Sequence, residues 1–314
     1  MSEATIGLCT FNGSARLPAN LHAIAACARN HDDLHITRLV VVDNASTDNT
    51  ADVVRSFAAE QARTPGALPV ELLNEPTPGK INAMRALFAQ TTEPIVLTTD
   101  DDTLPDPTWT SGLLSVFADE PRAGIVTGPV RNIWQTGPTP LARVYHRSLG
   151  DQDLGPTRVL LDRPTDFVMG ASMGVRREAL EASGWLDQVM LVGRTGTDLE
   201  CGAEDAEVCI RVRQAGWQIW YEPTASMGHV IPPERQTAAY LAKLRGAICR
   251  GEPALQWVAG EIDDHARATQ QAARARHRYL KSLLFTWNRR RRIRLAERRG
   301  KAEGWQRLAE RLAP

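Results

Sequence analysis

Short apolar runs alternate with segments of helical periodicity through the first hundred residues of the chain. An apolar run of four or five residues between turn residues is typical of a strand that is buried on both faces. Such strands, separated by amphipathic helices, predict βαβ units and an α/β fold with a mainly parallel sheet. The expected strands are 5–9, 39–42, 70–73 and 95–98, and the expected helices are 17–28, 50–62 and 80–89.

Polar residues follow each expected strand at the point where it ends. Thr10 and Asn12 follow the first strand, Asp43 the second, Asn74 the third, and residues 100–102 the fourth. In open α/β sheets, ligands bind beyond the carboxyl ends of the strands. The four polar strand ends therefore predict a binding site on one rim of the sheet.

The triplet Asp100, Asp101 and Asp102 is the most unusual of these strand ends. Adjacent carboxylates repel one another, so a chain that places three of them together usually supplies a cation. One interpretation is a solvated acidic turn or a helix cap. The other is a Mg²⁺ or Mn²⁺ site, because hard divalent ions prefer oxygen ligands and are often shared with phosphates.

Composition narrows the class of protein. The chain has 314 residues, of which 43% are hydrophobic and 24% are charged, which is typical of a globular protein with a substantial core. No apolar run approaches the roughly 20 residues of a membrane-spanning helix, and the start of the chain does not resemble a secretory signal, so we expect a cytoplasmic protein. The five cysteines form no C-x-x-C pair, which disfavours a zinc site or a disulfide framework.

Beyond these first strands, the order of several short motifs resembles family 2 of the nucleotide-sugar glycosyltransferases, which have the GT-A fold. The resemblance runs from about Ile6 to His229. Each motif alone is weak, and their common order carries the resemblance. The motifs are Thr10-Phe11-Asn12, the run from Val41 to Thr50, Gly79-Lys80-Ile81-Asn82-Ala83, Asp100-Asp101-Asp102 with Leu104-Pro105-Asp106, and Gly202-Ala203-Glu204-Asp205 followed by Arg211, Gly216 and His229.

The resemblance implies a GT-A sheet flanked by helices and a site for a nucleoside diphosphate sugar, with UDP as the favoured nucleotide and Mn²⁺ or Mg²⁺ as cofactor. Asp43 would bind the edge of the base, although a turn acceptor within its own loop is the alternative. The implied donor-binding residues are Thr10, Phe11, Asn12, Asp43, Lys80, Asp100, Asp101 and Arg235, and the implied metal ligands are Asp102, Asp100 and His229.

The pair Glu204 and Asp205 would face the acceptor. By resemblance, Asp205 is the general base that takes the proton of an attacking hydroxyl, and Glu204 assists it. The implied reaction is a direct displacement that inverts the sugar. We expect the transfer of one sugar rather than polymer synthesis, because the Gln-x-x-Arg-Trp sequence of processive members is not found after this region and no apolar run is long enough for a membrane span. The open alternatives are a nucleotidyltransferase and a non-catalytic protein that binds a nucleotide sugar or nucleic acid. A first-turn helix dipole partner is the structural alternative for the pair.

The C-terminal part of the chain differs from the rest. We expect a catalytic domain over 1–235, with a nucleotide-sugar half at 1–102 and an acceptor half at 103–235, and a helical extension over 236–314. Residues 274–299 contain eleven Lys and Arg against one acid, a net charge of +10, and include Trp287 and Arg289–Arg292. Such a segment indicates a solvated helix packed on its own domain, an anionic membrane surface at which the protein is peripheral, or contact with nucleic acid. The acceptor is accordingly expected to be a saccharide, a lipid-linked glycan or a modified nucleic-acid base.

Overall fold

A central sheet of eight strands forms the framework of the protein in a computed structural model, which describes residues 3–29, 35–195, 198–285 and 290–313. Four of its seven strand pairings are parallel. The predicted α/β class and mainly parallel sheet are confirmed. In spatial order, the strands are Val70–Glu75 (β3), His35–Asn44 (β2), Glu3–Thr10 (β1), Ile95–Asp100 (β4), Ser172–Arg176 (β9), Ala123–Thr127 (β6), Gln218–Tyr221 (β12) and Val159–Leu160 (β8).

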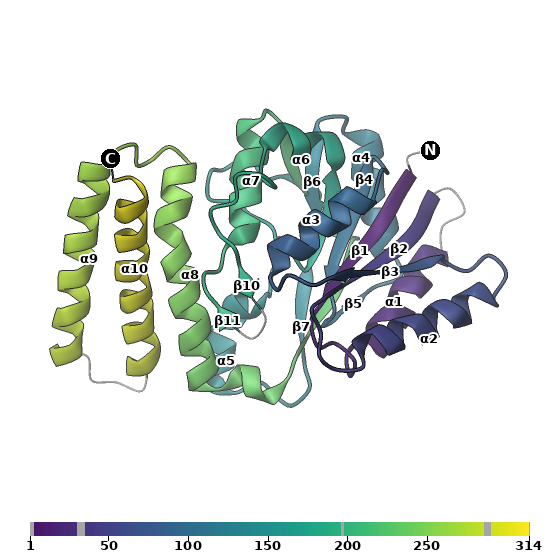
Figure 1. Cartoon of the computed structure of the whole chain (residues 1–314), viewed down its shortest axis with the longest axis horizontal. Coiled ribbons are helices and arrows are strands. Elements are labelled where there is room, and N and C mark those ends of the chain that lie inside the picture. Colours follow the sequence, from purple (N-terminus) through teal and green to yellow (C-terminus); the bar gives the residue numbers. More distant parts are fainter. Residues whose placement is uncertain (1–2, 30–34, 196–197, 286–289, 314) are drawn as a thin grey trace.

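Helices cover both faces of this sheet (Figure 1). In β2, Val41 belongs to one apolar cluster, and Val40 and Val42 belong to the other. This alternation follows from the period of two in a strand, and it explains why the run is apolar throughout. Helices Leu17–Arg29 (α1), Thr50–Ala62 (α2) and Trp109–Asp119 (α4) pack on the first face, and Lys80–Gln90 (α3), Arg177–Ser183 (α6) and Glu204–Gln214 (α7) pack on the second.

Two smaller sheets lie beside the main one. Strand Met227–Ile231 (β13) pairs with Thr103–Pro105 (β5) and with Val130–Trp134 (β7), and it opposes His229 to Thr103, the residue after the acidic triplet. Strands Arg194–Thr195 (β10) and Asp198–Leu199 (β11) form a short hairpin. The remaining short helices are Pro140–Val144 (α5), His146–Leu149 and Pro233–Gln236.

The predicted helical extension is confirmed as three long helices, Ala238–Val258 (α8), His265–Phe285 (α9) and Arg291–Arg311 (α10), with α10 between the other two in Figure 1. Helices α8 and α10 touch through glycines. A Cβ added at Gly300 would collide with the carbonyl oxygen of Gly246, and one at Gly304 would collide with the carbonyl oxygen of Arg250. Small residues allow the two backbones to approach this closely. The division of the chain at 235 and 236 stays a prediction.

None of the helices in the described ranges combines the length and apolarity that a bilayer crossing requires. All five cysteines are free thiols, and four of them are buried. The thiol of Cys27 shows the effect of this environment, because burial raises its pKa to about 12. The cysteines therefore behave as small core residues in this fold.

Candidate active site

A cleft of about 460 Å³ opens at the carboxyl end of β4. Its walls come from the ends of the sheet, from the first turns of α3 and α7, and from α8. Seven of the twelve predicted site residues line it, and they are Lys80, Asp100, Asp102, Glu204, Asp205, His229 and Arg235. Thr10, Phe11, Asn12, Asp43 and Asp101 are not among its lining residues.

Asp102, His229 and Arg235 meet on one side of the cleft. Nη1 of Arg235 lies 2.7 Å from Oδ2 of Asp102, and Nε2 of His229 lies 3.4 Å from the same oxygen. Nδ1 of His229 lies 2.8 Å from the carbonyl oxygen of Leu149. A carbonyl only accepts, so Nδ1 carries the hydrogen, and a neutral imidazole then keeps its lone pair on Nε2.

This donor set suits a divalent cation. A carboxylate oxygen and an imidazole nitrogen converge, and the second ring nitrogen is held by a backbone carbonyl, as is usual for metal-ligating histidines. Among the described residues, no three His, Cys, Asp or Glu side chains come together as a metal site. Asp102 and His229 would therefore hold a divalent ion that takes further ligands from phosphate or water.

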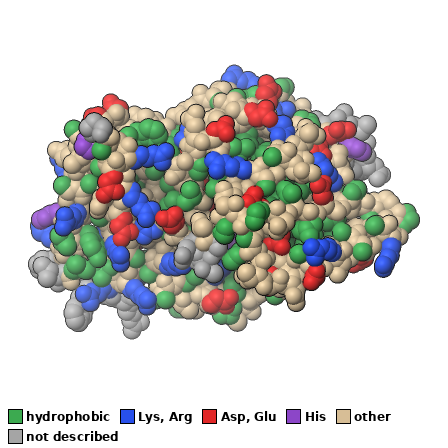
Figure 2. Space-filling model, in the orientation of Figure 1, with side chains coloured by type: hydrophobic (Ala, Val, Ile, Leu, Met, Phe, Trp, Pro, Cys, Tyr) green, Lys and Arg blue, Asp and Glu red, His purple; other side chains and the backbone are tan. Residues whose placement is uncertain are grey.

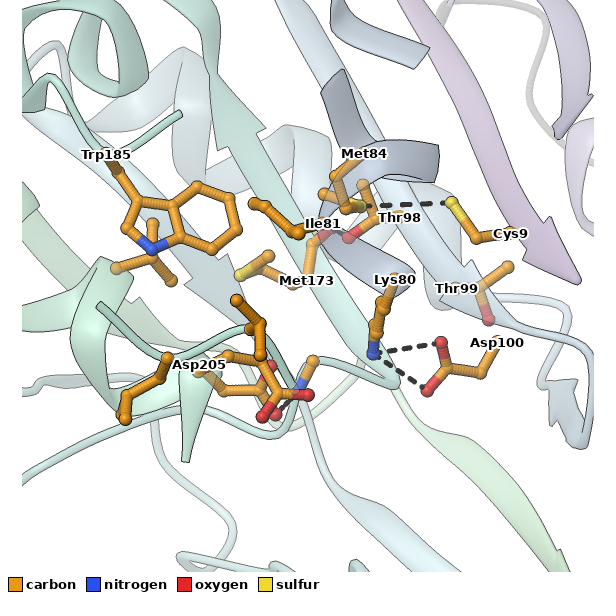
Figure 3. A pocket seen from close by; sticks show the side chains of 15 residues that line it. Cys9, Lys80, Ile81, Met84, Thr98, Thr99, Asp100, Met173, Trp185 and Asp205 are labelled. Atoms are coloured by element: carbon orange, nitrogen blue, oxygen red, sulfur yellow. Dashed lines mark hydrogen bonds and ion pairs between the residues drawn. The ribbon is translucent and has the colours of Figure 1, made fainter. Parts of the chain in front are cut away.

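Lys80 and Asp100 line both the cleft and a smaller pocket beside it, and they form an ion pair with Nζ 3.2 Å from Oδ1 (Figure 3). The lysine side chain is only 25% exposed. Burial would lower the pKa of Lys80, but the charges of Asp100 and then Asp205 outweigh it and raise that pKa. Lys80 is therefore not an exposed first-turn lysine but a fixed cation among carboxylates.

Glu204 and Asp205 occupy the first turn of α7 and face Lys80 across the cleft. The backbone N–H of Gly170 donates to Oδ2 of Asp205 at 2.9 Å, which fixes this carboxylate. Burial and the adjacent charge of Asp205 raise the pKa of Glu204 to about 7. Burial also raises the pKa of Asp205. Raised carboxyl pKa values in a cleft are a mark of functional sites, although ion-pair networks produce them too.

Asp101 lies behind the cleft wall and is tied to Arg16. Nη2 and Nε of Arg16 donate to its two carboxylate oxygens at 2.8 and 3.0 Å, and Oγ1 of Thr10 donates at 2.5 Å. These contacts join the ends of β1 and β4. Thr10 and Asp101 bond to each other, and Asp101 also bonds to Arg16. The middle residue of the triplet therefore holds the two strand ends together and does not line the cleft. Sequence reasoning did not single out Arg16 as its partner.

The remaining predicted donor residues lie in the loops after β1 and β2. Oδ1 of Asn12 accepts a hydrogen bond from the N–H of Thr47, which links the two loops. The N–H of Ser46 donates to Oδ1 of Asp43 at 3.2 Å. This is the turn-acceptor alternative considered for Asp43. Phe11 is half-buried, and its carbonyl accepts from Arg16.

Several cleft residues had no signal in the sequence. Arg147, Arg194, Tyr240 and Arg245 line the cleft but lie outside the motifs that carry the resemblance. Arg194 donates to the hydroxyl of Tyr240 at 2.9 Å, which connects the β10–β11 hairpin to α8. The contribution of α8 could not be found from sequence, because its cleft residues are scattered along an ordinary helical pattern.

The basic segment 274–299 is only partly described. Trp287 and Arg289 lie outside the described residues. Leu280 and Leu283, on the last turns of α9, are 49% and 41% exposed. Lys and Arg side chains are spread over the helical extension at the left of Figure 2, with acidic side chains among them.

The sheet order and the acidic strand end define the class of this protein as GT-A. One solved structure of this fold is the mannosyltransferase PcManGT from Pyrobaculum calidifontis in complex with GDP-Man and Mn²⁺, with a TM-score of 0.58 and 18% identity over 96% of this chain and 85% of that one. Another is GalNAc-T7 with UDP, GalNAc and Mn²⁺, with a TM-score of 0.53 and 14% identity over 79% of this chain and 47% of that one.

The family follows from the sequence comparison. The model for glycosyl transferase family 2 matches residues 5–184, and the model for glycosyl transferase family group 2 matches residues 95–290. This protein belongs to glycosyl transferase family 2, as the motifs predicted. The pre-mycofactocin glycosyltransferase of Mycobacterium tuberculosis is 30% identical over 165 residues, which are 51% of this chain and 32% of that protein. The chain thus spans about a third of the length of the curated relatives it matches.

Proposed function

We propose that this protein is an inverting, metal-dependent glycosyltransferase that moves one sugar from a nucleoside diphosphate sugar to a hydroxyl acceptor. The observation that carries the proposal is that one cleft is lined both by a metal-suited pair, Asp102 and His229, and by a fixed carboxylate, Asp205. A leaving diphosphate and an attacking hydroxyl need these two chemistries on opposite sides of one anomeric carbon. UDP is the favoured donor nucleotide by resemblance.

The donor side of the cleft would bind the nucleotide and its diphosphate. Asp102 and His229 would hold Mn²⁺ or Mg²⁺, which supplies positive charge to the departing diphosphate when bound. Arg235, which contacts Asp102, would bind a phosphate oxygen in place of that carboxylate when the donor is bound. Asp100 would face the ribose or the ion, with its orientation fixed by Lys80. Phe11, Asn12 and Asp43 would flank the base, and Thr10 and Asp101 would hold the loop ends in place through Arg16.

The acceptor side of the cleft would carry out the proton transfer. The acceptor oxygen forms a bond to the anomeric carbon while the bond from that carbon to the diphosphate oxygen breaks, and the hydroxyl proton passes to Asp205. The Gly170 N–H fixes Asp205 in place, and burial raises its pKa toward the range in which a base is useful. Glu204 would keep this region acidic and assist in binding the acceptor.

The test is nucleotide release from UDP- and GDP-sugars with Mn²⁺, with Mg²⁺ and with chelator, followed by NMR of the anomeric product. Asp205→Asn should lower the rate by about 10² to 10⁴, the usual contribution of a general base. Asp102→Ala should abolish metal-dependent nucleotide binding. Asp187→Asn, an exposed carboxylate outside the cleft, is the matched control and should behave as wild type. Transfer with retained configuration, or full activity of Asp205→Asn, would refute the proposed mechanism.

As a second part of this proposal, the basic segment 274–299 would contact an anionic membrane surface. Exposed Leu280 and Leu283 beside a basic surface favour an anionic membrane over nucleic acid, because leucines insert into lipid and contribute little to phosphate contacts. Vesicles rich in phosphatidylserine should sediment the wild type, and Leu280→Ser with Leu283→Ser should reduce this binding. Equal sedimentation of both proteins would exclude the leucines from the contact.

A further inference from the structure

A second cavity, of about 330 Å³, lies within the helical extension and shares no lining residue with the cleft. It is bounded by the end of α8, by α9 and by α10. Four of its ten lining residues are cations, and one is an acid, Glu261. The cations are Arg267, Arg278, Arg298 and Lys301. The cavity is therefore strongly positive in a chain whose net charge is zero.

Ion pairs inside the protein neutralise only part of this charge. Lys301 lies 2.7 Å from Glu252, and Arg267 reaches Asp263 at 4.0 Å. Within the described part of the chain, neither Arg278 nor Arg298 has an ion-pair partner. Two guanidinium groups from two different helices thus line one cavity without a carboxylate to pair with them.

The positions of the cations follow from helical spacing. On α9, Gln271 lies four residues after Arg267, and Arg278 lies seven residues after Gln271, so the three side chains share one face of the helix. On α10, Arg298 and Lys301 are three residues apart, and they repel one another unless an anion balances them. Arg267, Arg278 and Arg298 are exposed to solvent, so an anion can reach them from outside.

A buried indole forms part of the cavity wall. Trp305 is only 4% exposed and lines the cavity. Its N–H is not among the buried polar atoms of the described residues that lack a partner. The indole therefore supplies an apolar wall, and the charged donors of the cavity are its guanidinium and ammonium groups.

We propose that this cavity binds the phosphate group of a small phosphorylated ligand, remote from the donor cleft. Guanidinium groups bind phosphate oxygens in pairs, and a phosphate dianion would balance the charges of Arg278 and Arg298. A free phosphorylated metabolite and an anionic lipid headgroup share this chemistry. The exposed Leu280 and Leu283 are not among the lining residues, so the free ligand is the source that the site favours.

The experiment measures binding of inorganic phosphate and pyrophosphate to the full chain by calorimetry, with chelator present to suppress metal-diphosphate binding in the cleft. Chloride at equal ionic strength corrects for screening. The probe variant is Arg278→Ala with Arg298→Ala. The control variant is Arg276→Ala with Arg294→Ala, which removes the same charge from the same two helices outside the cavity. Circular dichroism and nucleotide binding of each variant check that it is folded.

We expect saturable binding to the wild type and to the control variant, with affinity at least tenfold weaker in the probe variant. A second arm uses vesicles of phosphatidic acid and of phosphatidylcholine. Binding to phosphatidic acid vesicles alone, lost in the probe variant, would support the site and assign its ligand to a lipid headgroup. Absence of binding in both arms, or equal weakening in both variants, would overturn the proposal, because screening alone would then explain the effect of charge.

Discussion

Nη1 of Arg235 contacts Asp102 at 2.7 Å and also lies 3.4 Å from Nε2 of His229. The guanidinium group thus stands where the two metal-suited donors converge. Arg235 lies on a short helix, Pro233–Gln236, which follows β13 along the chain. In the structure described here, an internal cation balances the charge of Asp102.

Replacement of Arg235 should therefore change metal binding in the absence of nucleotide. We expect Arg235→Ala to bind Mn²⁺ about tenfold more tightly, because a competing positive charge is removed from beside Asp102, and a tenfold change corresponds to about 1.4 kcal/mol. Electron paramagnetic resonance of free Mn²⁺ gives the affinity directly. Arg131→Ala, which removes an exposed ion pair with Asp153, is the control. Unchanged or weaker Mn²⁺ binding by Arg235→Ala would show that the arginine does not compete with the ion.

Glu204 should make the protein less stable as pH rises. Its pKa is raised to about 7 in the folded state from an ordinary value of 4.5, so the folded protein holds more protons than the unfolded chain between these values. Stability then falls as pH rises through this window, and the penalty is complete above about 7. Glu204→Gln should raise the free energy of unfolding at pH 8 by about 1 to 2 kcal/mol, a value reduced for partial exposure, and should have no effect below pH 4.

Urea unfolding across pH 4 to 8 measures this difference. Glu178→Gln is a matched control, because Glu178 is also a first-turn acid, in α6, but is exposed to solvent. Stabilisation by Glu204→Gln that does not depend on pH would contradict the assignment.

Lys80 should stabilise the folded protein through its neighbouring carboxylates. In Lys80→Met, Asp100 loses its ion-pair partner, and Asp205 and Glu204 lose a nearby positive charge. We expect a loss of about 1 to 2 kcal/mol at pH 8, less than for a fully buried pair because both side chains keep some exposure. Addition of Asp100→Asn should restore part of the loss. If Lys281→Met, at an exposed lysine of α9, costs as much as Lys80→Met, the cleft charges are not the cause.

The glycine contact between α8 and α10 should not tolerate a side chain. A methyl group at Gly300 meets the carbonyl oxygen of Gly246, and a backbone atom cannot turn aside as a side chain can. Overpacking of this kind costs about 1 to 3 kcal/mol, so Gly300→Ala should lower the melting temperature although alanine favours helices. Gly137→Ala, where a Cβ meets nothing within 4 Å, should be neutral. A stabilised Gly300→Ala variant would mean that the two helices can separate at little cost.

Local patterns in the sequence predicted the first half of the fold closely. Helix α2 spans Thr50–Ala62 as expected, because turn residues bound its apolar pattern on both sides. Residues 130–165 show no such period, and β7 and β8 within them are strands only because they pair with distant segments. Tertiary pairing of this kind leaves no local signal.

The site residues that lie in sequence motifs were predictable. The contacts that each of these residues makes in the folded protein were not. Residues 100–102 were identified together, but their division of labour was not. Asp101 turns to Arg16 on the far side of the strand end, whereas Asp102 turns to Arg235, more than a hundred residues away. Asp101 and Asp102 form the turn between β4 and β5, where the chain changes direction, so neighbours in the triplet meet different partners. Those partners are fixed by the fold as a whole.

Helix α8 contacts both the cleft and α10, and this limits how the protein can be divided or recombined. Tyr240, Leu244 and Arg245 line the cleft, while Gly246 lies against α10 and Arg245 also pairs with Glu297 of that helix at 2.7 Å. A chimera that exchanges residues 236–314 with those of a relative would thus exchange one wall of the cleft together with the tail. Differences among relatives in α10, from which no residue lines the cleft, can therefore alter the shape of the cleft by shifting α8.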